Sequence, residues 1–315
     1  MKNGLLNSSL SVEQVLIPEK LKGLHLGLAL LIVFIWGTNF AVIKFALIQI
    51  PPFLLAFLRF AMAFLPAAFL IPLPKVHFKN LMFYGVCIGL GQFGLLFFAI
   101  HRFISPGMAS LVIQSQVFFT IFFSVLQNGE KISRLQWAAL IISLCGLSVV
   151  VLHNDGETTL LGLLLILLAA LCWSLGNLTA KISQSSNFFH YVVWSSAFSC
   201  VPLFLMSLYF EGWELIKASL SNADFTIWCA IVWQSWGNTL LGYVGWAWLL
   251  SKYPSSVISP LALLVPLFGM GASRLFVGEV LPPWKLAAAG LILLGLLVNG
   301  YATSRKSIDS DLKAS

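Results

Sequence analysis

The residues best able to do chemistry in this chain are polar side chains inside long apolar runs. Arg59 is the clearest example, because it lies well inside the run PPFLLAFLRFAMAFL. An ionisable group at mid-membrane costs about 2.5–3.5 kcal/mol on insertion scales, so it usually faces a cavity or a partner. Arg59 could bind a substrate carboxylate at two points through its planar guanidinium. The alternative is an arginine that extends to the membrane surface or pairs with a carbonyl. We predict that Arg59 binds substrate.

Four amides and a lysine are further candidates for the same site. Asn39 and Asn177 occupy nearly matching places in two similar stretches, WGTNFAVIK and WSLGNLTAK. Their amides either line a shared cavity or bond neighbouring helices together. Gln114 and Gln116 are two residues apart and point to nearly opposite sides of a helix, so one of them should pack against protein. Lys44 either helps to hold an anion or extends to the membrane surface.

Deep aromatic side chains could complete the wall of such a site. An aromatic face can stack on a substrate or hold its ammonium group by a cation–π contact. Ordinary packing is the alternative for each residue. Glycines beside Gln92, which include Gly85 and Gly89, are expected to let a neighbouring helix approach closely. The deep candidates are Trp36, Trp173, Trp194, Trp246 and Gln92.

The acidic residues lie outside the apolar runs. Glu130 and Glu279 follow glycines in two matching turns, and we interpret them as turn residues, with a gating or helix-start role as the alternative. A carboxylate relay of the kind found in proton-driven pumps is therefore not expected within the membrane. No convergent group of titratable residues suggests a catalytic centre. We expect a protein that is not an enzyme and that carries no cofactor or metal.

The composition places the chain in a lipid bilayer. It is 59% hydrophobic and 9% charged, whereas soluble domains carry about 25% charged residues. The net charge of +7 comes mainly from short loops and both tails, which is typical of a membrane topology signal and not of nucleic-acid binding. The distribution of Lys and Arg predicts that both termini are cytoplasmic.

Ten apolar segments approach the roughly 20 residues that a spanning helix needs. They are residues 24–47, 53–71, 81–100, 106–127, 135–152, 160–181, 189–209, 226–250, 256–277 and 284–302.

The ten segments divide into two similar halves. Gly129-Glu130 in the first half recurs 149 residues later as Gly278-Glu279, and repetition at a fixed spacing indicates an internal repeat. Five spans per half is an odd number, so the second half must be inverted relative to the first. The sequence therefore predicts an all-α membrane protein of ten transmembrane helices in two inverted five-helix repeats. Its parts are a tail at 1–23, repeats at 24–152 and 158–303, and a tail at 304–315.

The remaining signal is a set of stretches: WGTNFAVIK at 36–44, PPFLLAFLRF at 51–60, QSQVFFTIFF at 114–123, WSLGN at 173–177, VVWSSA at 192–197, LLGYVGW at 240–246 and SPLALLVPLFG at 259–269. They resemble the ten-helix EamA group of the drug/metabolite transporter superfamily. The resemblance covers nearly the whole chain from residue 23 to residue 300. This resemblance implies an inner-membrane exporter of small metabolites in a bacterium. The chain also resembles the members of the group that export O-acetylserine and cysteine.

We therefore expect an exporter of a small zwitterionic amino acid or derivative that works by alternating access, as a monomer or homodimer. Arg59 would hold the carboxylate, and the amides would meet the amine and side chain, with only one of Gln114 and Gln116 taking part. A first alternative is a transporter of another solute, such as aromatic amino acids, nucleobases or drugs. A second is a membrane protein that does not transport, such as a lipid-modifying enzyme or a scaffold, for which only the 210–225 connection offers room.

Overall fold

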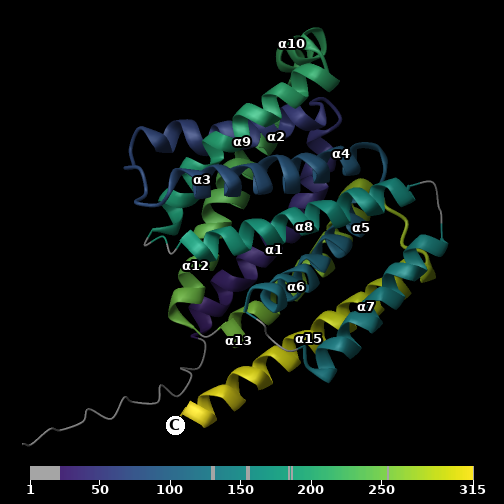
Figure 1. Ribbon diagram of the computed structural model, residues 1–315. Coiled ribbons are helices and arrows are strands. Elements are labelled where there is room, and N and C mark those ends of the chain that lie inside the picture. The colour runs from purple at the N-terminus through teal and green to yellow at the C-terminus, as the bar shows by residue number, and fades with distance from the viewer. Residues whose placement is uncertain are drawn as a thin grey trace, which may run out of the picture.

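The computed structural model describes residues 22–128, 132–153, 157–183, 185, 187–253 and 255–314, and Glu130 lies outside this set. Helices account for all the regular structure in the described ranges (Figure 1). The first half contains α1 Gly23–Ala46, α2 Pro52–Ala68, α3 Phe78–Gly85, η1 Val86–Gly94, α4 Leu95–Arg102, α5 Pro106–Val112, η2 Ile113–Ser115, α6 Gln116–Asn128 and α7 Arg134–Leu152. The second half contains α8 Leu160–Ser183, α9 Phe188–Phe210, α10 Trp213–Asn222, α11 Phe225–Val232, η3 Trp233–Leu241, α12 Gly242–Lys252, α13 Ser255–Ile258, η4 Ser259–Leu263, α14 Leu264–Ala272, η5 Ser273–Val277 and α15 Pro283–Ala314.

Helices overlap every one of the ten expected segments. Within the described residues, seven helices are long and apolar enough to cross a membrane, or eight if a pair joined at a 105° bend counts as one span. Two shorter apolar helices, Pro52–Ala68 and Leu261–Val277, cover the remaining segments. The chain is therefore an all-helical, multi-pass membrane protein, and the count of ten spans stays a prediction.

Two stretches expected to be loop or tail are helical. The 210–225 connection contains α10, which follows a sharp turn at Gly212, where φ is 79°. Ile216 is buried while most of α10 is exposed, as in a helix that lies on a surface. The last helix continues to Ala314, because the segment after Gly300 contains no glycine or proline to end it.

The last helix of the first half, α7, packs against the last helix of the second half, α15. α7 and α15 run side by side along one side of the molecule (Figure 1). A Cβ on Gly146 would lie 3.0 Å from the Ala288 carbonyl oxygen, and a Cβ on Gly295 would lie 2.7 Å from that of Ala139. Gly146 and Gly295 are 149 residues apart, and so are Ala139 and Ala288. The two contacts are therefore equivalent, and they require α7 and α15 to be antiparallel.

Four helical breaks fall at matching places in the described residues, whereas the short π-helix η5 occurs in the second half alone. η1 and η3 are nine-residue π-helices inside longer helical segments, and each lies in the third apolar segment of its half. The 3-10 turns η2 and η4 interrupt the fourth segment of each half. π-Turns inside α-helices are rare and occur often at functional sites. The two π-helices lead directly to the residues of the candidate site.

Candidate functional site

Arg59 lies in the interior with most of its donors unused. Its side chain is 0% exposed, and its Nη2 donates a hydrogen bond of 2.7 Å to Asn238 Oδ1. The guanidinium carbon lies 3.8 Å from the centre of the Phe93 ring. Neither Nε nor Nη1 has a hydrogen-bond partner. A guanidinium carries five N–H donors, so an edge remains available for an anion.

The two π-helices supply the residues that hold Arg59. Phe93 comes from η1 and Asn238 from η3, while Arg59 itself comes from α2. The Trp36 indole Nε1 donates to the Asn238 main-chain oxygen at 3.2 Å. A Cβ on Gly242 would lie 2.4 Å from that indole nitrogen, so α12 approaches Trp36 closely only because it has glycine here. The site therefore forms where α1, α2, η1 and η3 meet.

Aromatic rings form one wall of the site. The Trp36 ring centre lies 5.6 Å from that of Tyr243 and 5.2 Å from that of Trp246. The Tyr243 hydroxyl lies near the side chain of Gln92. These contacts bring together four residues of the predicted site, namely Arg59, Gln92, Trp36 and Trp246.

Unpartnered amide atoms lie in this layer and beside it. Asn39 Oδ1 and Gln92 Oε1 are buried without partners, and so are both amide atoms of Gln234. α1 and α12 are antiparallel, because Trp36 packs on Trp246 and the earlier His25 packs on the later Tyr253. Asn39 comes after Trp36 in α1, and Gln234 is near the start of η3, which leads into α12. Because the helices are antiparallel, Asn39 and Gln234 lie on the same side of the contact between Trp36 and η3. A buried polar group without a partner costs about 1–3 kcal/mol, so these groups are suited to water or a polar substrate.

The other predicted amides lie on α6 and α8. Asn177 Nδ2 donates to Gln116 Oε1 at 3.4 Å, and the Thr120 hydroxyl lies 2.9 Å from that of Ser174. Asn177 is exposed and Gln116 is partly exposed, whereas Gln114 is buried. The two glutamines thus differ in burial, as their spacing predicts. Asn177 bonds to Gln116, whereas Asn39 Oδ1 has no partner, despite their matching places in the sequence.

Three other predicted residues make contacts that support the fold. Lys44 Nζ donates to the main-chain oxygens of Ile100 and His101, at 3.0 and 3.3 Å, as cations do at helix C-termini. The Trp194 indole donates to the Pro72 oxygen at 3.1 Å. Trp173 is partly buried and packs on the hydrophobic core.

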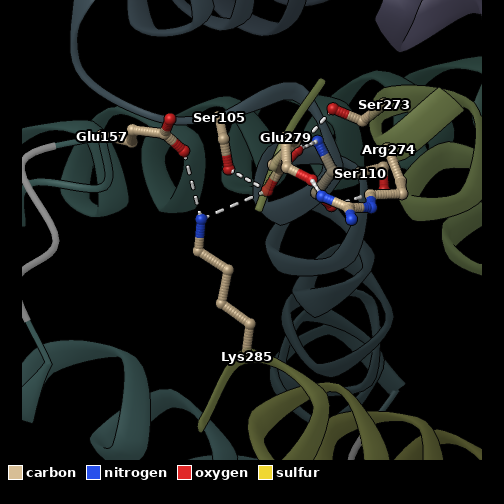
Figure 2. Close-up of polar contacts among 8 residues, drawn as sticks. Ser105, Ser110, Glu157, Ser273, Arg274, Glu279 and Lys285 are labelled. Carbon is tan, nitrogen blue, oxygen red and sulfur yellow. Dashed lines mark hydrogen bonds and ion pairs between the residues drawn. The ribbon is translucent and has the colours of Figure 1, made fainter. Parts of the chain in front are cut away.

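A second polar cluster surrounds Glu279, which is 3% exposed (Figure 2). Its carboxylate accepts hydrogen bonds from the Ser105 and Ser273 hydroxyls and from the Gly107 main-chain N–H at 2.9 Å. Lys285 Nζ lies 3.4 Å from Glu279 Oε1 and 3.4 Å from Glu157 Oε2. Glu279 is thus more than a turn residue. It binds the start of α5, which agrees with the alternative of a helix-start role.

Sequence reasoning missed Asn238, Tyr243 and Gln234. A signal was present, because WQSWGNT at 233–239 places several polar side chains inside an apolar run. Glu279 also had a signal in Lys285, a basic residue six positions later in an apolar segment.

Comparison with known proteins identifies the family. The EamA-like transporter family matches residues 24–152 and again residues 160–301. A probable amino-acid metabolite efflux pump of Salmonella typhimurium is 39% identical over 87% of this chain and 94% of its own length. Its namesake in Escherichia coli K12 is 36% identical over the same shares. A solved crystal structure with 17% sequence identity covers 90% of this chain and 99% of its own at a TM-score of 0.60, which shows a shared fold. The chain belongs to the EamA-like transporter family.

Proposed function

We propose that this protein exports a small amino acid or amino-acid derivative, of the cysteine or O-acetylserine type, across a bacterial inner membrane. The observation that carries the proposal is the buried guanidinium of Arg59, whose Nε and Nη1 have no partner. Its only hydrogen-bond partner among the described residues is the neutral amide of Asn238, so its charge is not compensated by a carboxylate. A substrate carboxylate would supply that compensation through charge-assisted hydrogen bonds.

The rest of the site suits the other end of a zwitterion. The unpartnered oxygens of Asn39, Gln92 and Gln234 can accept hydrogen bonds from an ammonium group. The faces of Trp36 and Trp246 can add cation–π attraction. α1, α2, η1 and η3 contain no Asp or Glu, so a lone cationic solute would meet Arg59 without a balancing charge. Relatives named amino-acid metabolite efflux pumps support the same substrate class.

Transport by alternating access between two inverted halves fits the packing of the helices. The antiparallel contact of α7 with α15 supports opposite orientations of the repeats. α2 and α9 form a second such pair, since Phe53 stacks near Phe210 and Phe64 near Trp194. The Arg59 site lies between α2, η1 and elements of the other half, where inverted-repeat transporters bind substrate.

The test is transport by purified protein in proteoliposomes with Arg59→Gln, Arg59→Lys and the exposed control Arg102→Gln. We expect Arg59→Gln to weaken substrate-dependent thermal stabilisation and uptake at least about tenfold, equivalent to 1.4 kcal/mol. Arg59→Lys should recover part of the loss, since it keeps the charge but not the two-point geometry. Normal transport by folded Arg59→Gln would show that the substrate binds elsewhere.

A second solute class is favoured by the aromatic wall. The Trp36 ring contacts the rings of both Tyr243 and Trp246, and Phe93 stacks on Arg59. Such a wall would also fit an aromatic amino acid. Competition among cysteine, O-acetylserine, phenylalanine and tryptophan for the same uptake separates the two classes, because the better-fitting solute inhibits at the lower concentration.

A further inference from the structure

A groove of about 520 Å³ lies between the start of α3 and the end of α8. Its polar end contains His77 and Lys79, and its apolar walls contain Phe83, Leu178 and Ile182. The groove is separate from the Arg59 site, whose residues do not line it. Its size is within the range of about 300–1,000 Å³ that is usual for ligand pockets.

The polar end of the groove is held in shape by hydrogen bonds. Asn80 Nδ2 donates to the Thr179 main-chain oxygen at 2.9 Å, which joins α3 to α8. Asn80 Oδ1 accepts from the Tyr191 hydroxyl at 2.7 Å. His77 Nδ1 accepts from the Lys79 main-chain N–H at 3.3 Å, so the proton of the neutral imidazole is on Nε2. His77 Nε2 and the Lys79 ammonium are therefore both donors at this end.

The walls continue into the part of the helices that faces lipid. Phe83 is 48% exposed and Ile182 is 60% exposed. Both belong to helices apolar enough to cross a membrane. A ligand that fits both ends must have a polar head and an apolar chain. Since the groove opens where two spans begin and end, the headgroup region of the bilayer lies beside it.

The charge around the groove has one sign. Neither residues 52–129 nor residues 158–210 contain an Asp or Glu, and these ranges include both walls. Lys75 and Lys181 lie near Lys79 and Ile182 in the sequence and add to the positive charge. Basic pockets between transmembrane helices bind anionic lipid head groups. We propose that this groove binds one anionic phospholipid, with its phosphate at His77 and Lys79 and an acyl chain along Phe83, Leu178 and Ile182.

The test is thermal unfolding of the full-length protein in neutral detergent with added phosphatidylglycerol or phosphatidylcholine. We expect phosphatidylglycerol to raise the melting temperature more than phosphatidylcholine. Lys79→Gln should weaken the apparent affinity for phosphatidylglycerol about tenfold. Lys252→Gln removes the same charge at the exposed end of α12 and should keep the wild-type affinity.

Three outcomes would overturn the lipid site. Equal stabilisation by the two lipids would show that charge is not recognised. Equal loss in Lys79→Gln and Lys252→Gln would show a diffuse surface attraction. Stabilisation by sodium phosphate alone at the same concentration would show a site for a soluble anion. Because the readout is unfolding without transported solute, the result is independent of the function proposed for Arg59.

Discussion

Arg59 differs from most buried arginines in the partner that it holds. Asn238 Oδ1 fixes the guanidinium by one hydrogen bond of 2.7 Å, and Phe93 covers one face of the guanidinium plane. An amide orients the cation but leaves its charge uncompensated, whereas a carboxylate would neutralise it. Asn238 is therefore a positioning residue that preserves the attraction of Arg59 for an anion.

Changing Asn238 should reveal this role. Asn238→Asp would give Arg59 an internal carboxylate that competes with the substrate, so we expect substrate binding to weaken by more than about tenfold. Asn238→Ala removes only the orienting bond and should weaken binding less. Substrate titration by thermal shift measures both. Equal effects of the two variants would show that charge compensation at Arg59 does not control binding.

The sequence predicts how deep a residue lies in the membrane better than it predicts which residues surround it. Arg59, Gln92 and Trp36 were recognisable because a polar or aromatic residue inside an apolar run needs a partner. Lys44 and Trp194 gave a similar signal, yet they bind main-chain oxygens near the ends of other helices. Position along the chain does not tell which face of a helix a residue occupies, so the two cases could not be separated.

At the scale of the helix, close packing depends on a few glycines. A Cβ on Gly37 of α1 would lie 2.6 Å from the Val265 main-chain oxygen and 2.5 Å from Phe268 Cβ, both in α14. Gly85 and Gly89 let α9 approach in the same way, at Ser195 and Ser199, which confirms the packing role predicted for them. Main-chain atoms cannot move aside as a flexible side chain can, so these contacts require glycine.

Gly37→Ala should therefore separate α1 from α14. We expect overpacking to lower the free energy of unfolding by about 1–3 kcal/mol. Gly27→Ala is the matched control on the same helix, because a Cβ there has nothing within 4 Å. Thermal unfolding in detergent compares the two. A melting temperature unchanged in Gly37→Ala would contradict the tight contact.

The positions of the π-helices could not be predicted from the sequence. VCIGLGQFG and WQSWGNTLL share little beyond glycine and a polar amide, and such residues also occur in ordinary α-helices of membranes. A wide turn is selected by packing against neighbouring helices and not by local preference. The residues of η3 were therefore harder to place than Arg59.

Across the whole molecule, two carboxylates from the second half bind helix starts in the first half. Glu279 accepts from the Gly107 main-chain N–H of α5 at 2.9 Å. Glu211 accepts from the Phe53 and Leu54 main-chain N–H groups of α2, at 2.6 and 3.1 Å. Helix N-termini attract anions through free N–H groups and the helix dipole. Burial raises the pKa of Glu211, although these hydrogen bonds oppose the shift.

Glu279→Gln should loosen the connection between α5 and α15. Lys285, which is 0% exposed, would lose a carboxylate that it contacts, and breaking a buried pair costs about 3 kcal/mol. We expect a lower melting temperature, with partial recovery in Glu279→Gln/Lys285→Met, where an apolar side chain replaces the buried charge. Glu214→Gln, an exposed acid in α10, should have little effect. No recovery in the double variant would assign the loss to α5 alone.

The matching π-helices have a consequence for the history of the chain. A π-turn arises when a helix accommodates one additional residue, and that residue turns every side chain beyond it to a new direction. Two independent insertions at equivalent depths would both have had to survive this rotation. The simplest history has a single insertion in an ancestral gene that encoded one half, copied when that gene duplicated and fused.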